Sequence, residues 1–328
     1  MNPYVFVVGC QRSGTTLLQQ MLDAHPELAV TCDSEFIPLM LQDARETGAP
    51  AAGDATLHAD TVELLIAYRS RSGRAGFQRL GLKEEDVRQA AAGAETYAGF
   101  VTRLFDAVAA SRGKPYAGDK TPDYARSIPL LHRLFPQARF VHIVRDGRDV
   151  ALSLQRWAQT AARGPVRTAV WKEEPVAACA LWWSGMVTSA ERGSSVLSAG
   201  QYLTIRYEDL IAQPEATLIR VTAFLDLPFA PAMLRYYESK RQVRRPGHTS
   251  MLPPTAGLRD WRKELAPGGV AVFEYLAGDL LAAHGYERTV VEFPPELQAR
   301  AANWRRRWRK KFGQAGDLPP PSPHRDAV

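Results

Sequence analysis

The stretch VFVVGCQRSGTTLL, residues 5–18, joins an apolar run to a glycine-containing loop and then to the start of a second apolar segment. Residues 4–8 predict a strand that is buried on both faces. Residues 16–24 predict a helix, because their apolar side chains recur on one helical face. Gly9 and Gly14 have the spacing of a phosphate-binding loop, in which backbone N–H groups and the positive end of the helix dipole surround an anion. The stretch therefore predicts an anion site at the end of a strand.

The loop departs from the nucleotide-hydrolysing pattern at one position, where Thr15 stands in place of the lysine. That lysine would reach the β- and γ-phosphates of a nucleoside triphosphate, so its absence argues against hydrolysis of ATP or GTP. Arg12, Ser13 and Thr16 add side-chain donors to the same loop. Phosphate binding is therefore retained. A nucleotide-dependent small-molecule kinase and a non-catalytic nucleotide-binding protein stay open as alternatives.

Further strand-like runs alternate with helical segments along the chain. Residues 140–144 form an apolar run, Arg145 follows it, and a helix is expected from Asp149. Residues 202–205 and 214–225 repeat the order of strand and helix. Such alternation predicts a parallel sheet with crossover helices. We therefore expect an α/β fold, a P-loop-like parallel sheet flanked by helices.

Three segments lie outside this alternation. Residues 43–113 are rich in Ala, Gly and Arg and predict a helical insertion within a domain of residues 1–296. Residues 297–312 predict a basic amphipathic helix, and residues 313–328 predict a disordered tail. On the basic helix, one face carries four apolar residues: Leu297, Ala301, Trp304 and Trp308. This face either lies on an anionic membrane or an acidic partner, or it docks on the body with the arginines in water.

The 328 residues have an ordinary composition, with 45% hydrophobic residues, 23% charged residues and a net charge of +6. Collagen-like, disordered and membrane-spanning classes are therefore excluded for most of the chain. The excess of positive charge lies at residues 300–311, so no general nucleic-acid-binding surface is expected. The three cysteines lack the spacing of zinc ligands or of a disulfide framework, and the N-terminus lacks a signal-peptide pattern. We expect no metal site and a cytoplasmic location, with membrane association depending on the basic helix.

The string RSGTTLLQQMLDAHPEL, residues 12–28, resembles the 5′-phosphosulfate loop of sulfotransferases. The enzymes concerned use 3′-phosphoadenosine-5′-phosphosulfate (PAPS), and the resemblance is strongest to the tyrosylprotein-type and related bacterial members. It implies PAPS as the co-substrate, with no metal, and contacts to the donor from Arg12, Ser13, Gly14, Thr15 and Thr16. It also implies transfer of a sulfonate group to the hydroxyl of a small molecule, a glycolipid or a peptide.

A second string, FVHIVRDGRDVALSL, residues 140–154, resembles the segment that holds the 3′-phosphate of the donor in this family. The resemblance assigns that role to Arg145 and Ser153, which agrees with the preference of a guanidinium for bidentate contact with phosphate. In residues 205–210, IRYEDL, Tyr207 is expected beside the adenine. Taken alone, the Arg-Asp-Gly-Arg sequence also fits a solvated turn, and Tyr207 also fits a core tyrosine. Looser similarity further along the chain adds four candidate donor contacts: Arg244, Arg245, Ser250 and Arg259.

For the general base the resemblance favours Glu35, and Asp33 is the adjacent alternative. A carboxylate in a partly desolvated cleft accepts a proton from a hydroxyl more readily, although Glu35 also fits a helix cap. The second acid and the arginine that accompany this glutamate in the tyrosylprotein branch are not reproduced, since Phe36 follows Glu35. The resemblance assigns Lys120 to the bridging oxygen of the donor, together with Arg12. A buried His142 in the predicted strand is interpreted as a core residue.

Overall fold

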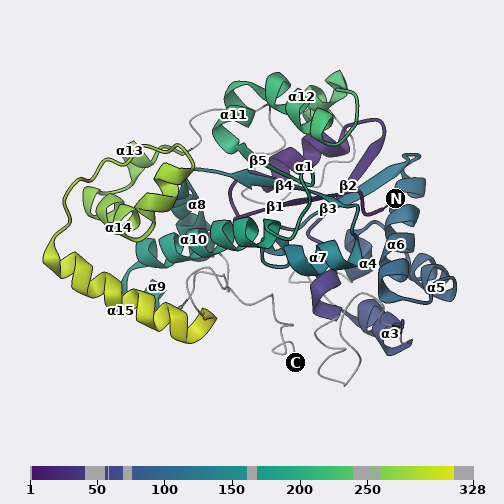
Figure 1. Ribbon diagram of the computed structural model, residues 1–328, viewed down its shortest axis with the longest axis horizontal. Coiled ribbons are helices and arrows are strands. Elements are labelled where there is room, and N and C mark those ends of the chain that lie inside the picture. Colours follow the sequence, from purple (N-terminus) through teal and green to yellow (C-terminus); the bar gives the residue numbers. More distant parts are fainter. Residues whose placement is uncertain are drawn as a thin grey trace.

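Within the computed structural model, the described residues form a parallel sheet of five strands in the order β2-β3-β1-β4-β5 (Figure 1). The strands are β1 (Val5–Gly9), β2 (Leu28–Cys32), β3 (Tyr116–Lys120), β4 (Arg139–Val144) and β5 (Tyr202–Arg206). The described residues are 2–40, 56–57, 59–68, 76–160, 168–238, 253 and 259–313.

Strand β1 is central because both of its faces are apolar. Phe6 and Val8 pack into the core on one side of the sheet, and Val5 and Val7 pack into the core on the other side. Side chains alternate along a strand, so an uninterrupted apolar run of this length fills two cores at once. All five residues of β1 are buried. The strand pairs in parallel with β3 and with β4.

Helices cover both faces of the sheet (Figure 1). The core with Val5 and Val7 includes side chains of α1, α11, α12 and the 3-10 helix η2, whereas α5 to α8, α10, α14 and α15 contribute to the other core. The helices up to β4 are α1 (Thr15–Asp23), α3 (Ala59–Ala67), α4 (Gly76–Arg79), α5 (Glu84–Ala92), α6 (Tyr97–Ser111), η1 (Pro122–Arg126) and α7 (Ile128–Leu134). The later ones are α8 (Gly147–Thr160), α9 (Ala169–Glu173), α10 (Pro175–Ser194), α11 (Tyr207–Ala212), α12 (Pro214–Phe224), η2 (Pro231–Glu238), α13 (Trp261–Glu264), α14 (Pro267–Ala283) and α15 (Pro295–Phe312). None of the helices in the described part is long and apolar enough to cross a membrane.

The fold class expected from the sequence is confirmed, and the predicted strands and helices begin and end within about two residues of the observed ones. The helix expected from Asp149 begins earlier, at Gly147. Strand β3 was not identified from the sequence, because Gly118, Asp119 and Lys120 are poor strand formers. Gly118 is required there, since a Cβ atom would lie 2.3 Å from the carbonyl oxygen of Val5 in the neighbouring strand.

The basic helix α15 docks on the body through its tryptophan face. Trp304 is fully buried and its indole N–H donates to Glu173 at 2.9 Å. Trp308 is also buried and lies against Trp182 and Phe312. The alternative in which this face lies on a membrane is therefore wrong, because the rings are covered by the protein itself. The tail predicted to be disordered lies outside the described residues from residue 314 on.

Candidate active site

The predicted site residues gather at the carboxyl edge of the sheet, where parallel strands of α/β proteins present their ligand sites. Strand β1 leads into the glycine-containing loop, β3 ends at Lys120, β4 leads into Arg145, and β5 leads into Tyr207. The register aligns these ends, because Gly9 pairs with Ile143 and Val144 pairs with Arg206. The sheet itself therefore positions both halves of the expected donor site.

The loop before α1 has a backbone that requires glycine. Gly14 is the N-cap of α1, with a φ of 93° and no side-chain cap. A Cβ atom at this position would lie 2.3 Å from Cδ2 of Tyr207, so the tyrosine ring lies directly on the loop. Tyr207 therefore borders the expected phosphate site.

The Ser13 hydroxyl is buried, and within the described residues it has no hydrogen-bond partner. A buried donor of this kind fits an anion in the loop.

Residues of the second predicted site, which follows β4, lie next to this loop. The Nε of Arg12 donates to Oγ of Ser153 at 2.9 Å, which joins the two sites directly. Arg145 lies over the Tyr207 ring, with 4.4 Å between its Cζ and the ring centroid. Its Nε is buried and has no partner among the described residues. Burial, followed by repulsion from Arg259 and Arg145, lowers the pKa of Arg12. Guanidinium groups that crowd one another in this way fit a ligand with several negative charges.

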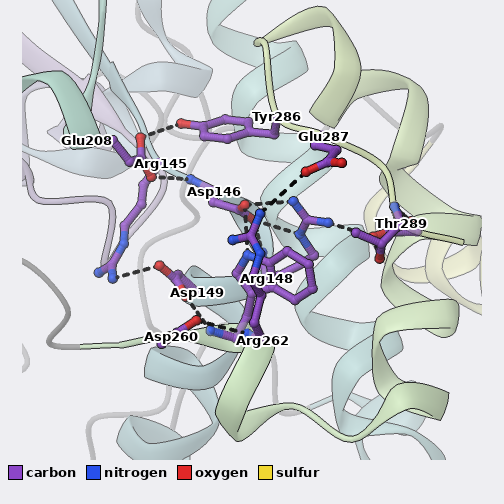
Figure 2. A network of polar contacts seen from close by, with 12 residues as sticks. Arg145, Asp146, Arg148, Asp149, Glu208, Asp260, Arg262, Tyr286, Glu287 and Thr289 are labelled. Atoms are coloured by element: carbon purple, nitrogen blue, oxygen red, sulfur yellow. Dashed lines mark hydrogen bonds and ion pairs between the residues drawn. The ribbon is translucent and has the colours of Figure 1, made fainter.

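A buried ionic network holds the second site in place (Figure 2). Arg148 is fully buried between Asp146, at 2.8 Å, and Glu274, at 2.5 Å. Its guanidinium carbon lies 3.7 Å from the ring centroid of Trp261, and the indole N–H of Trp261 donates to Asp146 at 3.1 Å. The interpretation of the Arg-Asp-Gly-Arg sequence as a solvated turn is therefore wrong. The network fixes α13, and hence the preceding Arg259, against the start of α8.

The same network orients Arg145 through its neighbours. One oxygen of Asp149 pairs with Arg145 at 3.2 Å, and the other accepts the backbone N–H of Trp261 at 3.0 Å. The backbone N–H of Asp146 donates to Glu208 at 3.0 Å, and Glu208 also accepts the hydroxyl of Tyr286 at 2.8 Å (Figure 2). Sequence reasoning missed these supporting residues. One signal was present, because Glu274 is a charge within the apolar stretch 270–277.

Lys120 lies between Thr16 of α1 and Asp33, the alternative candidate for the base. Its Nζ pairs with Oδ1 of Asp33 at 2.6 Å and donates to Oγ1 of Thr16 at 3.3 Å. Burial acts to lower the pKa of Lys120, but Asp33 and Cys32 outweigh it, so that the pKa is raised and the side chain stays cationic. The structure thus brings Lys120 to the loop, as expected, with Asp33 as its direct partner.

The turn that carries both candidate bases is strained. Asp33 has a φ of 54° and Glu35 a φ of 62°, the left-handed region that residues with a Cβ atom rarely adopt. Arg79 of α4 pairs with Glu35 at 3.7 Å and also donates to the backbone oxygen of Asp33. The hydroxyl of Tyr68 donates to Glu35 at 3.4 Å. An arginine beside the glutamate is therefore present, and it comes from α4, far from Glu35 in the chain.

The remaining predicted residues divide into those the structure places and those it does not. Arg259 lies close enough to Arg12 and Arg145 for electrostatic repulsion. Burial, followed by repulsion from Arg156, lowers its pKa. His142 is fully buried, with its Nδ1 2.7 Å from the hydroxyl of Tyr202, and burial lowers its pKa to about 3. It is a neutral core residue, as its position in the strand indicated. Three predicted donor contacts lie outside the described residues: Arg244, Arg245 and Ser250.

The fold and the candidate site together define a P-loop-like α/β protein that has no lysine in its glycine-containing loop and that gathers arginines beside this loop. The sulfotransferase family model matches residues 3–231, and the chain belongs to that family. It is 26% identical over 251 residues to protein-tyrosine sulfotransferase 2 of Gallus gallus, covering 76% of this chain and 57% of that protein. It is 24% identical over 294 residues to protein-tyrosine sulfotransferase 1 of Homo sapiens, covering 87% of this chain and 70% of that protein. The chain thus spans little more than half the length of the first of these relatives.

Among solved structures, the chain is similar to the sulfotransferase domain from the Synechococcus PCC 7002 olefin synthase. The TM-score is 0.59 at 23% identity, and the match covers 87% of this chain and 95% of that domain. The likeness shows a shared fold, which extends past residue 231 where the family model ends.

Proposed function

We propose that this protein transfers a sulfonate group from PAPS to the hydroxyl of an acceptor. The observation that carries the proposal is the hydrogen bond between Arg12 of the loop and Ser153 of the second site. It supports a single ligand that bears one anionic group at the loop and another beside Arg145. A donor with a 5′-phosphosulfate and a 3′-phosphate has this distribution of charge, and Tyr207 is proposed to border its base.

The proposed chemistry is an in-line displacement, in which the sulfur–oxygen bond to the acceptor forms while the bond to the phosphate oxygen breaks. The cationic Lys120 and Arg12 stabilise the negative charge that develops on the leaving phosphate oxygen. These two cations supply the positive charge that the leaving phosphate oxygen needs, and the proposal includes no metal.

The proton of the acceptor hydroxyl goes to a carboxylate of the 33–35 turn. Glu35 is the base favoured by the sequence, and Arg79 and Tyr68 hold it. The contact between Asp33 and Lys120 supports Asp33 as the second candidate, because Lys120 is the proposed partner of the bridging oxygen. The acceptor is proposed to be a small molecule, a glycolipid or a peptide with a hydroxyl group, and the proposed location is the cytoplasm.

The test is an assay of sulfonate transfer with PAPS and a panel of phenols, sugars, lipid alcohols and tyrosine peptides. We expect formation of 3′-phosphoadenosine-5′-phosphate that depends on one class of acceptor and needs no divalent cation. Glu35→Gln and Asp33→Asn are then compared on that acceptor, and the variant of the true base keeps its affinity for the donor while its kcat falls about 100-fold or more. Transfer of the γ-phosphate of ATP, with no reaction of PAPS, contradicts the proposal and favours the kinase alternative.

A further inference from the structure

The carboxylate of Asp119 is fully buried at the end of β3, directly before Lys120. It accepts hydrogen bonds from three hydroxyl groups, those of Thr31 at 2.6 Å, Ser34 at 3.0 Å and Thr121 at 2.6 Å. Burial raises the pKa of this carboxyl, and the three hydroxyl donors act against burial. Nothing in the proposed chemistry uses Asp119, although it is next to Lys120 in the chain.

Ser34 connects this buried carboxylate to the strained turn. It lies between Asp33 and Glu35, the two residues with left-handed backbone conformations. Such conformations persist only where surrounding contacts enforce them, because a residue with a Cβ atom is strained in this region. Since the Ser34 hydroxyl donates to Asp119, the hydroxyl of Tyr124 donates to Ser34 across 2.9 Å.

Two further contacts tie the turn to the same group of side chains. The hydroxyl of Tyr124 accepts the backbone N–H of Ile37 at 3.3 Å. The backbone N–H of Asp33 donates to the carbonyl oxygen of Lys120 at 2.6 Å. The turn is therefore held at its beginning by the strand that carries Asp119, in its middle by Asp119, and at its end by Tyr124.

We infer that Asp119 is a positioning residue, which holds residues 33–35 in the conformation that keeps Asp33 beside Lys120 and Glu35 beside Arg79. Asp119 acts through the turn and touches no substrate. The catalytic consequence rests on the proposed function, in which a carboxylate of this turn is the base. A carboxylate on a turn reaches a reactive geometry only when its own backbone is fixed. Asp119, which accepts the hydrogen bond of Ser34, therefore determines how the carboxylates of Asp33 and Glu35 are oriented.

The test is hydrogen exchange of the amides in residues 33–40, measured by mass spectrometry on the full chain. Asp119→Asn keeps the volume of the side chain but removes the charge that three hydroxyls share. We expect exchange in residues 33–40 to become about tenfold faster or more, while the strand β4 is unchanged. Ser34→Ala removes only the turn's own hydroxyl and is expected to act in the same direction, with a smaller effect on stability.

Glu274→Gln is the matched control, because it alters a buried carboxylate in the separate network around Arg148. It is expected to loosen residues 259–265 and to weaken binding of 3′-phosphoadenosine-5′-phosphate, without any change in residues 33–40. Asp119→Asn is expected to show the reverse pattern, with unchanged affinity for this nucleotide and a lower kcat on the acceptor that the wild-type protein uses.

Unchanged exchange of residues 33–40 in both Asp119→Asn and Ser34→Ala overturns the inference, whatever the activity. Faster exchange with an unchanged kcat overturns the catalytic part of the inference and the assignment of the base to this turn. In that case the link between Asp119 and the turn is retained. The two failures are therefore distinguishable in one set of variants.

Discussion

Replacement of Gly14 by alanine tests whether Tyr207 lies on the phosphate loop as the structure has it. The new Cβ atom would lie 2.3 Å from Cδ2 and 2.8 Å from Cε2 of the ring. The ring has little room to move, because Arg145 lies over it. Crowding of this kind costs about 1–3 kcal/mol. The left-handed backbone, with a φ of 93°, adds about 1–2 kcal/mol for a residue with a Cβ atom.

Gly200→Ala separates these two contributions. Gly200 has a similar φ of 88°, but no atom lies within 4 Å of the position that a Cβ would take. It therefore carries the backbone cost alone. Urea denaturation of both variants is expected to show a loss of about 1–2 kcal/mol for Gly200→Ala and a loss of about 2–5 kcal/mol for Gly14→Ala.

The double variant Gly14→Ala with Tyr207→Ala completes the test. Removal of the ring leaves space for the new methyl group, so the two substitutions together should cost about 1–3 kcal/mol less than the sum of their separate effects. Equal stability of Gly14→Ala and Gly200→Ala, or simple additivity in the double variant, would refute the placement of the ring on the loop.

Three further substitutions test other parts of the structure. Arg145→Ala should weaken binding of 3′-phosphoadenosine-5′-phosphate by about 100-fold, since the proposed bidentate contact with the 3′-phosphate is lost, with little effect on 5′-AMP; equal losses in calorimetry would contradict the proposed role of Arg145 at the 3′-phosphate. Because the pKa of His142 is lowered to about 3, this imidazole binds a proton below about pH 6.5 in the unfolded chain but stays neutral in the folded chain. The free energy of unfolding should therefore fall by about 1.4 kcal/mol per pH unit as the pH is lowered from about 6 to 4. Denaturation curves of His142→Gln should lack this contribution to the pH dependence. Trp304→Ala should cost about 3–5 kcal/mol in urea denaturation, and a loss below 1 kcal/mol would mean that α15 is not docked.

The candidate site residues whose positions could be predicted are those that one short stretch of the chain carries. The loop with Gly14, and the pair Arg145 and Ser153, are each carried by one strand and the helix after it. Their spacing along the chain therefore determines their spacing in space. The uninterrupted apolar run of residues 4–8 likewise predicted a strand buried on both faces, and β1 is such a strand.

The parts that could not be predicted depend on contacts between distant segments. Arg79 reaches Glu35 from α4, and Glu274 reaches Arg148 from α14, and no pattern near either residue indicates the partner. Such pairs are set by how helices pack on the sheet, which local periodicity does not specify. The tryptophan face of α15 illustrates the same point, because the amphipathic pattern was equally suited to lipid and to the protein body.

The central claim is that one site holds a nucleotide with a 3′-phosphate beside Arg145 and a 5′-anion in the loop. Calorimetric titration of the full chain with 3′-phosphoadenosine-5′-phosphate, against ADP and against ATP with magnesium, tests it most directly. We predict tight binding that needs no magnesium and that is weakened at least tenfold when the 3′-phosphate is absent. Preferential binding of ATP with magnesium would contradict the account.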